Sequence, residues 1–306
     1  MIDERDDEDS PDELRRREVP IPPQRNGIAT AALVLGVLAF CGGLTALPGL
    51  ICGVIGMGRA TARGEAGRGM ALAGTILSGV GFLTTIPLLI ALLLPAVQKV
   101  REASARMQSS NNLKQIGIAI HYHNDVNDRL PSPDYYVGPS GGEPSSQSDR
   151  LSWRVAMLPY LEQDRLHRQF RLAEPWTSSA NRPLSQYVVK ALIHPSDGPT
   201  EPMTRYRIFY GGGAAFELGR PLHLSSIADG SSNTIAVVEG GDRVTWTQFD
   251  EYPFGMDGPL PKLGVPKTSV FQAAMFDGSV RAIRTSIDPM VLKSGIHASD
   301  GLPLGE

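Results

Sequence analysis

Two long stretches of the chain, residues 26–58 and 69–98, contain no charged side chain. About 20 apolar residues are enough to cross a bilayer core as a helix, so both stretches predict membrane-embedded segments. The first is too long for one untilted span, and helix-breaking residues such as Pro48 and Gly49 lie in its middle. Two interpretations follow: a single long kinked helix, or a hairpin of two short embedded helices that turns near these two residues.

Residues 59–68, which separate the two stretches, hold three arginines and one glutamate. The excess of Lys and Arg in short cytoplasmic loops predicts that this segment is cytoplasmic. A second span at about 74–96 then delivers residues 99–306 to the outside. The same rule keeps the Arg-rich tail of residues 1–25 inside. Both flanks of residues 26–58 then lie on one side of the membrane, which favours the hairpin interpretation.

Apolar residues recur at helical spacing beyond the second span, which predicts one helix from about 87 to 124 with a kink at Pro95. The repeat comprises Val97, Val100, Ala103, Met107, Leu113, Ile116 and Ile120. A Gly-, Ser- and Pro-rich loop follows at 130–149. Helical patterns then cover 152–170, where Pro159 can split the helix, and 181–193.

The rest of the chain has the texture of short strands bounded by Gly and Asp. The predicted strands are 205–210, 234–239, 244–248, 271–276 and 279–283. Asp277 and Gly278 lie between the last two, and an Asp-Gly pair there predicts a hairpin with a type I′ turn. The predicted fold class is membrane-anchored α+β: apolar N-terminal helices, then a long helix packed on an antiparallel sheet.

Composition and charge exclude several classes of protein. The chain has 306 residues with 42% hydrophobic residues, 20% charged residues and a net charge of −3. No part has the excess of positive charge that nucleic-acid binding requires. Residues 1–25 carry many acids and prolines, which predicts a disordered tail rather than a signal peptide. Cys41 and Cys52 both lie in the first apolar stretch, so the chain is not held together by disulfides.

The polar residues that invite a chemical interpretation are few. His121 and His123 point apart on a helix, so with Asp125 they make a poor metal site. His194 stands in a Pro-Ser-Asp turn that Asp197 is expected to cap.

Further candidates lie in the strand-rich part of the chain. The segment 231–233 is expected to be a turn, because no nucleophile motif surrounds its serines. Gly-rich residues 211–213 lack the helix and Lys of a phosphate loop. Four aspartates could offer oxygen ligands to calcium without being fixed as a set: Asp229, Asp242, Asp250 and Asp277. The tryptophans are expected to be core or rim residues: Trp153, Trp176 and Trp246. The sequence thus predicts no catalytic residue, no cofactor and no metal site.

The segment IALLLPAVQKVREASARMQSSNNLKQIGIAIHYHNDVNDRLP, residues 90–131, resembles the start of a bacterial pseudopilin-like family, domain of unknown function 1559. Further blocks resemble that family in the same order. They are SWRVAMLPYLEQDRLHRQF (152–170), EPW with NRP (174–183), HPSD (194–197), DGSSNTIAVVE (229–239) and FDGSVRAI (276–283).

The N-terminal part resembles a small membrane module, domain of unknown function 4190. Its matching segments are ALVLG (32–36), GVIG (53–56), GRGM (67–70) and ALAG (71–74).

The chain departs from the pseudopilin-like pattern at several positions. The usual processing site has a basic residue before Gly-Phe and a glutamate after it, but around Gly81 and Phe82 both are missing. The resemblance therefore implies a protein that is neither cleaved by a prepilin peptidase nor assembled into a fibre. Ser109 and His194 replace two usual cysteines, and Lys267 replaces a usual histidine.

These observations divide the chain into a disordered tail (1–25), a membrane module (26–80), a half-embedded pilin-like helix (81–128) and a soluble α+β domain (129–306). We expect a non-enzymatic, membrane-anchored protein displayed outside the cytoplasmic membrane, with a structural or interaction role in the envelope or in secretion. The expected partners are the lipid bilayer and other envelope or pilin-like proteins, with no nucleic acid. The alternative is an extracytoplasmic binding module for a small ligand, a glycan or calcium.

Overall fold

The computed structural model describes residues 25–42, 45–63, 66–135, 149–220 and 222–302. The chain divides into two compact units, Met1–Lys99 and Val100–Glu306. The predicted disordered tail lies almost entirely outside the described residues, as does most of the predicted Gly- and Ser-rich loop.

The first unit contains helices α2 (Gly27–Gly42) and α3 (Ala46–Arg63) and the beginning of α4 (Arg68–Asn127). Residues 26–58 therefore form two helices, as in the hairpin interpretation. The predicted position of the turn is wrong, because Pro48 and Gly49 lie in the first turn of α3, where Gly49 N–H donates to the Thr45 carbonyl at 2.9 Å. A proline is tolerated there because its missing N–H would have no helical partner.

Helix α4 is longer than the predicted range of 87–124, because it starts at Arg68 and continues through Pro87 and Pro95 to Asn127. In the described part of the chain it is the one helix long and apolar enough to cross a membrane, and only 6% of its most apolar stretch is buried. Leu88 and Leu92, in that stretch, are exposed. Such a helix fits a membrane-associated protein.

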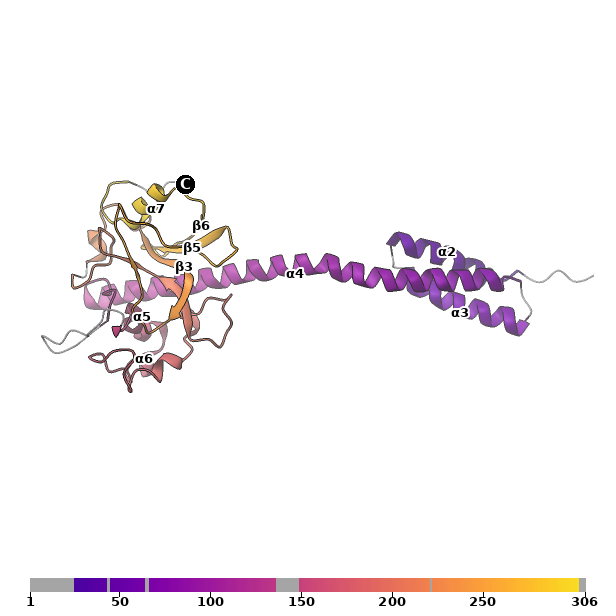
Figure 1. Ribbon diagram of the computed structural model, residues 1–306, viewed down its shortest axis with the longest axis horizontal. Helices are drawn as coiled ribbons and strands as arrows, with labels where there is room; N and C mark the ends of the chain where they lie inside the picture. The colour runs from indigo at the N-terminus through magenta and orange to yellow at the C-terminus, as the bar shows by residue number, and fades with distance from the viewer. Residues whose placement is uncertain (1–24, 43–44, 64–65, 136–148, 221, 303–306) are drawn as a thin grey trace, which may run out of the picture. The chain divides into compact units, whose positions relative to one another are not determined.

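The second unit is the predicted α+β fold, with the C-terminal half of α4 beside an antiparallel sheet (Figure 1). The strand order is β1-β3-β5-β6. The strands are β1 (Met203–Arg207), β3 (Ile235–Thr245), β5 (Val270–Met275) and β6 (Val280–Arg284). A separate parallel pair joins β2 (Phe209–Tyr210) to β4 (Tyr252–Pro253).

Both faces of the sheet are covered, as the alternation of side chains along a strand allows. Val237 and Ala274 belong to one core together with Leu113 and Ile116 of α4. Val238, Ala273 and Met275 belong to a second core, to which α7 (Pro289–Ile296) contributes Leu292 and Ile296.

The remaining helices are short, and each is a single turn or little more. They are α5 (Trp153–Met157), η2 (Leu158–Leu161), α6 (Asp164–His167), η3 (Leu184–Gln186), η4 (Lys190–Leu192) and η5 (Leu224–Ser226). The helix predicted over 152–170 is split, because Pro159 opens η2 and Glu162 ends it with a left-handed φ of 62°. The helix predicted over 181–193 is wrong, since only the 3-10 turns η3 and η4 form there.

Two details of the predicted strands are corrected. Most of the run 234–239 and the first two residues of the run 244–248 belong to one strand, β3, which continues through Gly240 and Gly241 and ends at Thr245, so residues 246–248 are not part of a strand. The hairpin at Asp277 and Gly278 is present, but its turn is not type I′, because only Gly278 has a positive φ, of 84°. Gly278 N–H donates to the Met275 carbonyl at 3.0 Å, which is the pattern of a three-residue loop with glycine in the left-handed position.

Candidate functional site

A buried polar network joins α4 to the sheet around the carboxylate of Glu239 on β3. Ser109 Oγ on α4 donates to Glu239 Oε1, His194 Nε2 donates to the same oxygen at 3.1 Å, and the Gln272 backbone N–H on β5 donates to Oε2 at 2.8 Å. Tyr206 on β1 donates to Ser109 Oγ at 2.9 Å. Each of these donors bonds to the Glu239 carboxylate directly or through Ser109, so the polar groups of the network satisfy one another.

Neighbouring groups fix the direction of these bonds. Asn112 on α4 donates from Nδ2 to the Ile193 carbonyl at 2.9 Å and to the Tyr206 hydroxyl at 3.4 Å. Ser196 N–H donates to His194 Nδ1 at 3.2 Å, so the proton of a neutral His194 lies on Nε2, facing Glu239. Burial raises the pKa of Tyr206 well above its usual range, so its hydroxyl remains a donor.

The two positions at which the resembling family usually has cysteine, Ser109 and His194, thus meet at one carboxylate oxygen. The predicted role of the His194 turn is partly wrong. Asp197 N–H closes the turn onto the His194 carbonyl at 3.0 Å, but the Asp197 carboxylate pairs with Arg205, with two bonds to its Nε at 2.8 and 3.0 Å, rather than capping. A buried guanidinium is the stronger partner for that carboxylate.

A second buried cluster pairs Arg154 of α5 with Glu251, and both side chains are completely buried. Arg154 Nη1 lies 2.7 Å from Glu251 Oε1, and Glu251 Oε2 accepts the Ile208 N–H at 2.9 Å. Arg154 also donates to three carbonyls, those of Tyr206 at 2.8 Å, Trp246 at 2.9 Å and Gln248 at 3.1 Å. Each nitrogen of the guanidinium contacts a protein oxygen, so this cluster fixes structure rather than holding a ligand.

The histidines at the end of α4 do not form a metal site. His123 is buried, donates from Nδ1 to the Arg129 carbonyl at 3.1 Å and packs edge-on against Tyr160. Burial lowers its pKa below the usual 6.5. His121 is only half-buried.

Three of the four candidate calcium ligands make hydrogen bonds or ion pairs with different partners. Asp250 pairs with Arg207 at 2.8 Å, and Asp277 accepts the Ser279 N–H at 2.8 Å within its hairpin. Asp242 lies at the pocket described below. Asp229 accepts the N–H groups of Asp300 at 2.8 Å and Gly301 at 2.7 Å.

Asp229 does lie close to two other metal-binding residue types, with ligand atoms of Asp229, His297 and Asp300 all within 4.8 Å of one another. However, His297 Nδ1 accepts the Ser299 N–H at 3.1 Å, which leaves the proton on Nε2. That nitrogen is then a donor rather than a ligand. The trio is therefore explained by hydrogen bonding within the C-terminal loop.

The other singled-out residues have structural roles. Residues 231–233 form the turn before β3, where Asn233 Nδ2 donates to the Asp229 carbonyl at 3.1 Å. Gly211, Gly212 and Gly213 all have positive φ, and an added Cβ at Gly213 would lie 2.2 Å from His297. The tryptophans follow the prediction, with Trp153 and Trp246 in the core and Trp176 partly buried.

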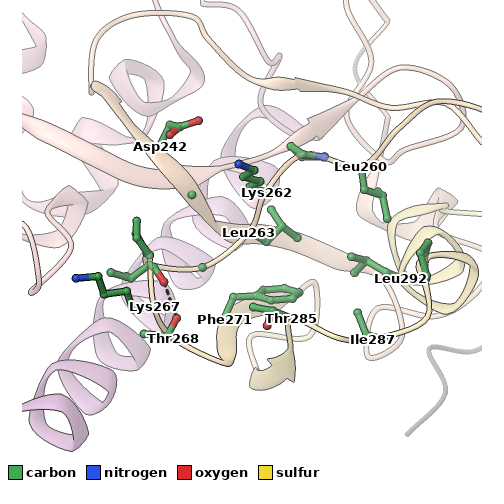
Figure 2. A pocket seen from close by; sticks show the side chains of 16 residues that line it. Asp242, Leu260, Lys262, Leu263, Lys267, Thr268, Phe271, Thr285, Ile287 and Leu292 are labelled. Carbon is green, nitrogen blue, oxygen red and sulfur yellow. Dashed lines mark hydrogen bonds between the residues drawn. The ribbon is translucent and has the colours of Figure 1, made fainter.

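A cavity of about 560 Å³ in the second unit lies where β3 leaves β5 and pairs instead with the loop 260–268 (Figure 2). Gly241 N–H donates to the Lys262 carbonyl at 2.9 Å, and Gly264 N–H to the Glu239 carbonyl at 2.8 Å. Its walls come from the loop 260–268, β5 and the segment between β6 and α7. Its volume is within the range typical of small-molecule sites.

Two segments of the chain match models of protein families. Residues 28–88 match a family described as a domain of unknown function (DUF4190), and residues 98–216 match a family described as a protein of unknown function (DUF1559). The last two sequence blocks of the resemblance, at 229–239 and 276–283, lie beyond the matched range. No curated protein and no solved structure matches the chain.

These matches confirm both resemblances. From its N-terminus, the chain joins a segment similar to the DUF4190 domain to a segment similar to the DUF1559 family, in the order that its motifs predict.

Proposed function

We propose that the chain is a non-enzymatic, membrane-anchored, pseudopilin-like protein whose second unit is displayed outside the cytoplasmic membrane. Its role is structural or interactive, in the cell envelope or the secretion machinery. Helix α4 indicates membrane association. The proposal adds the side of the membrane on which the second unit lies and the kind of role that it has.

The observation that carries the proposal is the composition of α4 along its length. Its apolar stretch has exposed side chains such as Leu92, which suits lipid contact. From Ser109 onward the same helix buries Leu113 and Ile116 completely in the core of the second unit. A single covalent element therefore serves as anchor and as part of the domain, which is how a displayed domain is held at a surface.

The arrangement of nucleophiles and bases supports a non-enzymatic role. Among the described residues, the grouping nearest to a nucleophile, a base and an acid is Ser109, His194 and Glu239. Here the carboxylate stands between the other two, so His194 does not contact Ser109 as a base must. All three are buried, and Ser109 and His194 each hydrogen-bond to Glu239 Oε1.

The orientation is supported by Arg59, Arg63 and Arg68, which flank the junction of α3 and α4 and favour a cytoplasmic position for it. The proposed display is tested with a C-terminal tag on the full chain and protease added outside intact cytoplasmic membranes. We expect loss of the tag, with a cytoplasmic marker protected. A tag that is digested only after the membrane is ruptured would overturn the proposed side.

Processing is tested separately by mass spectrometry of the N-terminus of the purified chain. The missing glutamate and basic residue near Gly81 and Phe82 predict an uncleaved protein. A mature chain beginning at Phe82 would refute that part of the proposal. Crosslinking in membranes followed by purification of the full chain then identifies the envelope or pilin-like partners, and recovery of the chain without any partner would refute the interaction role.

A further inference from the structure

The cavity between loop 260–268 and α7 has a polar end and an apolar end (Figure 2). Asp242 and Lys267 lie on one side of the cavity, and Lys262 lies nearer its centre beside Leu263. Leu260, Ile287 and Leu292 lie at the opposite end, and Leu263 and Phe271 lie between the two groups. A molecule that filled this space would have to be amphipathic, because only its apolar part could replace water against the leucines without loss of hydrogen bonds.

The charged side chains that line the cavity belong to exposed residues. Lys262, Lys267 and Asp242 are exposed, and none of them makes a side-chain hydrogen bond or ion pair within the described residues. Two lysines against one aspartate give the cavity lining a net positive charge. An anionic group is therefore the complementary ligand group.

The backbone at Lys267 adds an independent observation. Thr268 N–H donates to the Val265 carbonyl at 3.1 Å, so residues 265–268 form a β-turn with Pro266 and Lys267 at its centre. Lys267 has a φ of 75°, the conformation that position i+2 of a type II turn requires and that glycine or asparagine adopts most easily. A lysine held in this strained conformation beside a cavity supports a ligand-binding role for that cavity.

We propose that this cavity binds a small amphipathic anion, a carboxylate attached to an apolar chain or ring. The carboxylate contacts Lys267 at the charged side of the cavity, and the apolar part lies along Phe271 toward Ile287 and Leu292. This inference goes beyond the proposed function and does not depend on the side of the membrane on which the second unit lies.

Three probes of nearly equal shape but different charge test whether the cavity prefers an anion: 4-phenylbutyrate, 4-phenylbutanol and 4-phenylbutylamine. The full chain in lipid nanodiscs is titrated with each by calorimetry, and titrations of empty nanodiscs are subtracted. We expect 4-phenylbutyrate to bind at least about tenfold more tightly than the alcohol, as a charge-assisted contact allows, and the amine to bind weakest.

Substitutions then locate the site. Lys267→Gly should reduce the affinity for 4-phenylbutyrate about tenfold and leave the alcohol unchanged, while folding is preserved because glycine suits the φ of 75°. Ile287→Ser should weaken the anion and the alcohol alike. Lys114→Ala, an exposed lysine of α4 outside the cavity, is the matched control and should change neither.

No binding of 4-phenylbutyrate at millimolar concentration would overturn the proposal. So would equal binding of the three probes, or preference for the amine, which would make Asp242 the dominant group. Unchanged affinity in Lys267→Gly would show that the anion binds elsewhere.

Discussion

Helix α4 packs in two different ways in the two units of the chain. In the first unit its contacts with α2 and α3 are made by small residues. An added Cβ on Gly74 would lie 2.5 Å from the backbone of Ala32, and one on Gly36 would lie 2.8 Å from the Gly74 carbonyl. In the second unit the same helix buries Leu113 and Ile116 and inserts polar side chains into a hydrogen-bonded network.

The difference follows from what surrounds each part. Helices in an apolar environment gain little from burying large apolar side chains, so close approach of backbones through small residues determines their packing. A domain in water gains from each buried apolar side chain, and buried polar groups then define one arrangement among many. The segments of the first unit that are rich in small residues, such as 32–36 and 71–74, therefore form helix–helix contacts. They are not sites of backbone flexibility.

The largest effect is expected in the second unit, from Arg154→Met. This change leaves the buried Glu251 with only the more distant Arg207, 3.8 Å away, as an ion-pair partner, and removes the donor to three backbone carbonyls. We expect a loss of about 3–5 kcal/mol in the free energy of unfolding. Denaturant unfolding followed by tryptophan fluorescence measures it, because all three tryptophans lie in this unit. Arg168→Met, which breaks an exposed ion pair with Asp164, is the control and should change little.

The next effect tests the first unit. Gly74→Ala places a methyl group against the backbone of α2, and we expect a loss of about 1–3 kcal/mol in the stability of the helix packing. Gly79→Ala meets nothing within 4 Å and should be neutral or stabilising by up to about 1 kcal/mol, the gain in helix propensity. The midpoint of SDS unfolding, followed by far-UV circular dichroism, measures both. Equal shifts in the two variants would contradict the packing described.

A smaller effect is expected where α4 joins the sheet. Ser109→Ala removes one donor to Glu239 and the acceptor of the Tyr206 hydroxyl, which should lower the free energy of unfolding by about 1–3 kcal/mol. Ser104→Ala, on the exposed side of α4, is the matched control. Tryptophan fluorescence in denaturant again provides the measurement, and identical midpoints for the two variants would show that the network adds no stability.

The smallest effect is a dependence on pH. Burial lowers the pKa of His123 in the folded chain below its unfolded value of about 6.5, so the unfolded chain binds more protons between the two values. The contribution of His123 to the free energy of unfolding is therefore fully present above pH 6.5. It is lost as the pH falls from there through the folded pKa, with a slope of at most about 1.4 kcal/mol per pH unit. His123→Gln should reduce that slope in unfolding experiments between pH 7 and pH 5. An unchanged slope would assign the acid sensitivity to other groups.

Hydrophobic periodicity predicted the long helix and the sheet because both patterns are local. It predicted a span at about 74–96 and a helix from about 87 to 124, whereas a single helix, α4, covers both and begins at Arg68. The polar network could not be predicted, because Ser109 and Glu239 are 130 residues apart and the sequence around each of them does not point to the other. The cavity was also missed, although the run of Pro266 and Lys267 carried a signal, a turn with lysine where glycine is usual.

The central claim is that one helix is an anchor in lipid at its beginning and part of a water-exposed domain at its end. Spin labels placed singly at exposed positions of α4, from Leu83 to Val126, test it in the full chain in bilayers. We predict preferential access of oxygen at Leu88 and Leu92, and preferential access of a water-soluble nickel complex at Met107 and Val126. Access of the nickel complex at every position would contradict the account, because it would mean that the apolar stretch of α4 lies in water.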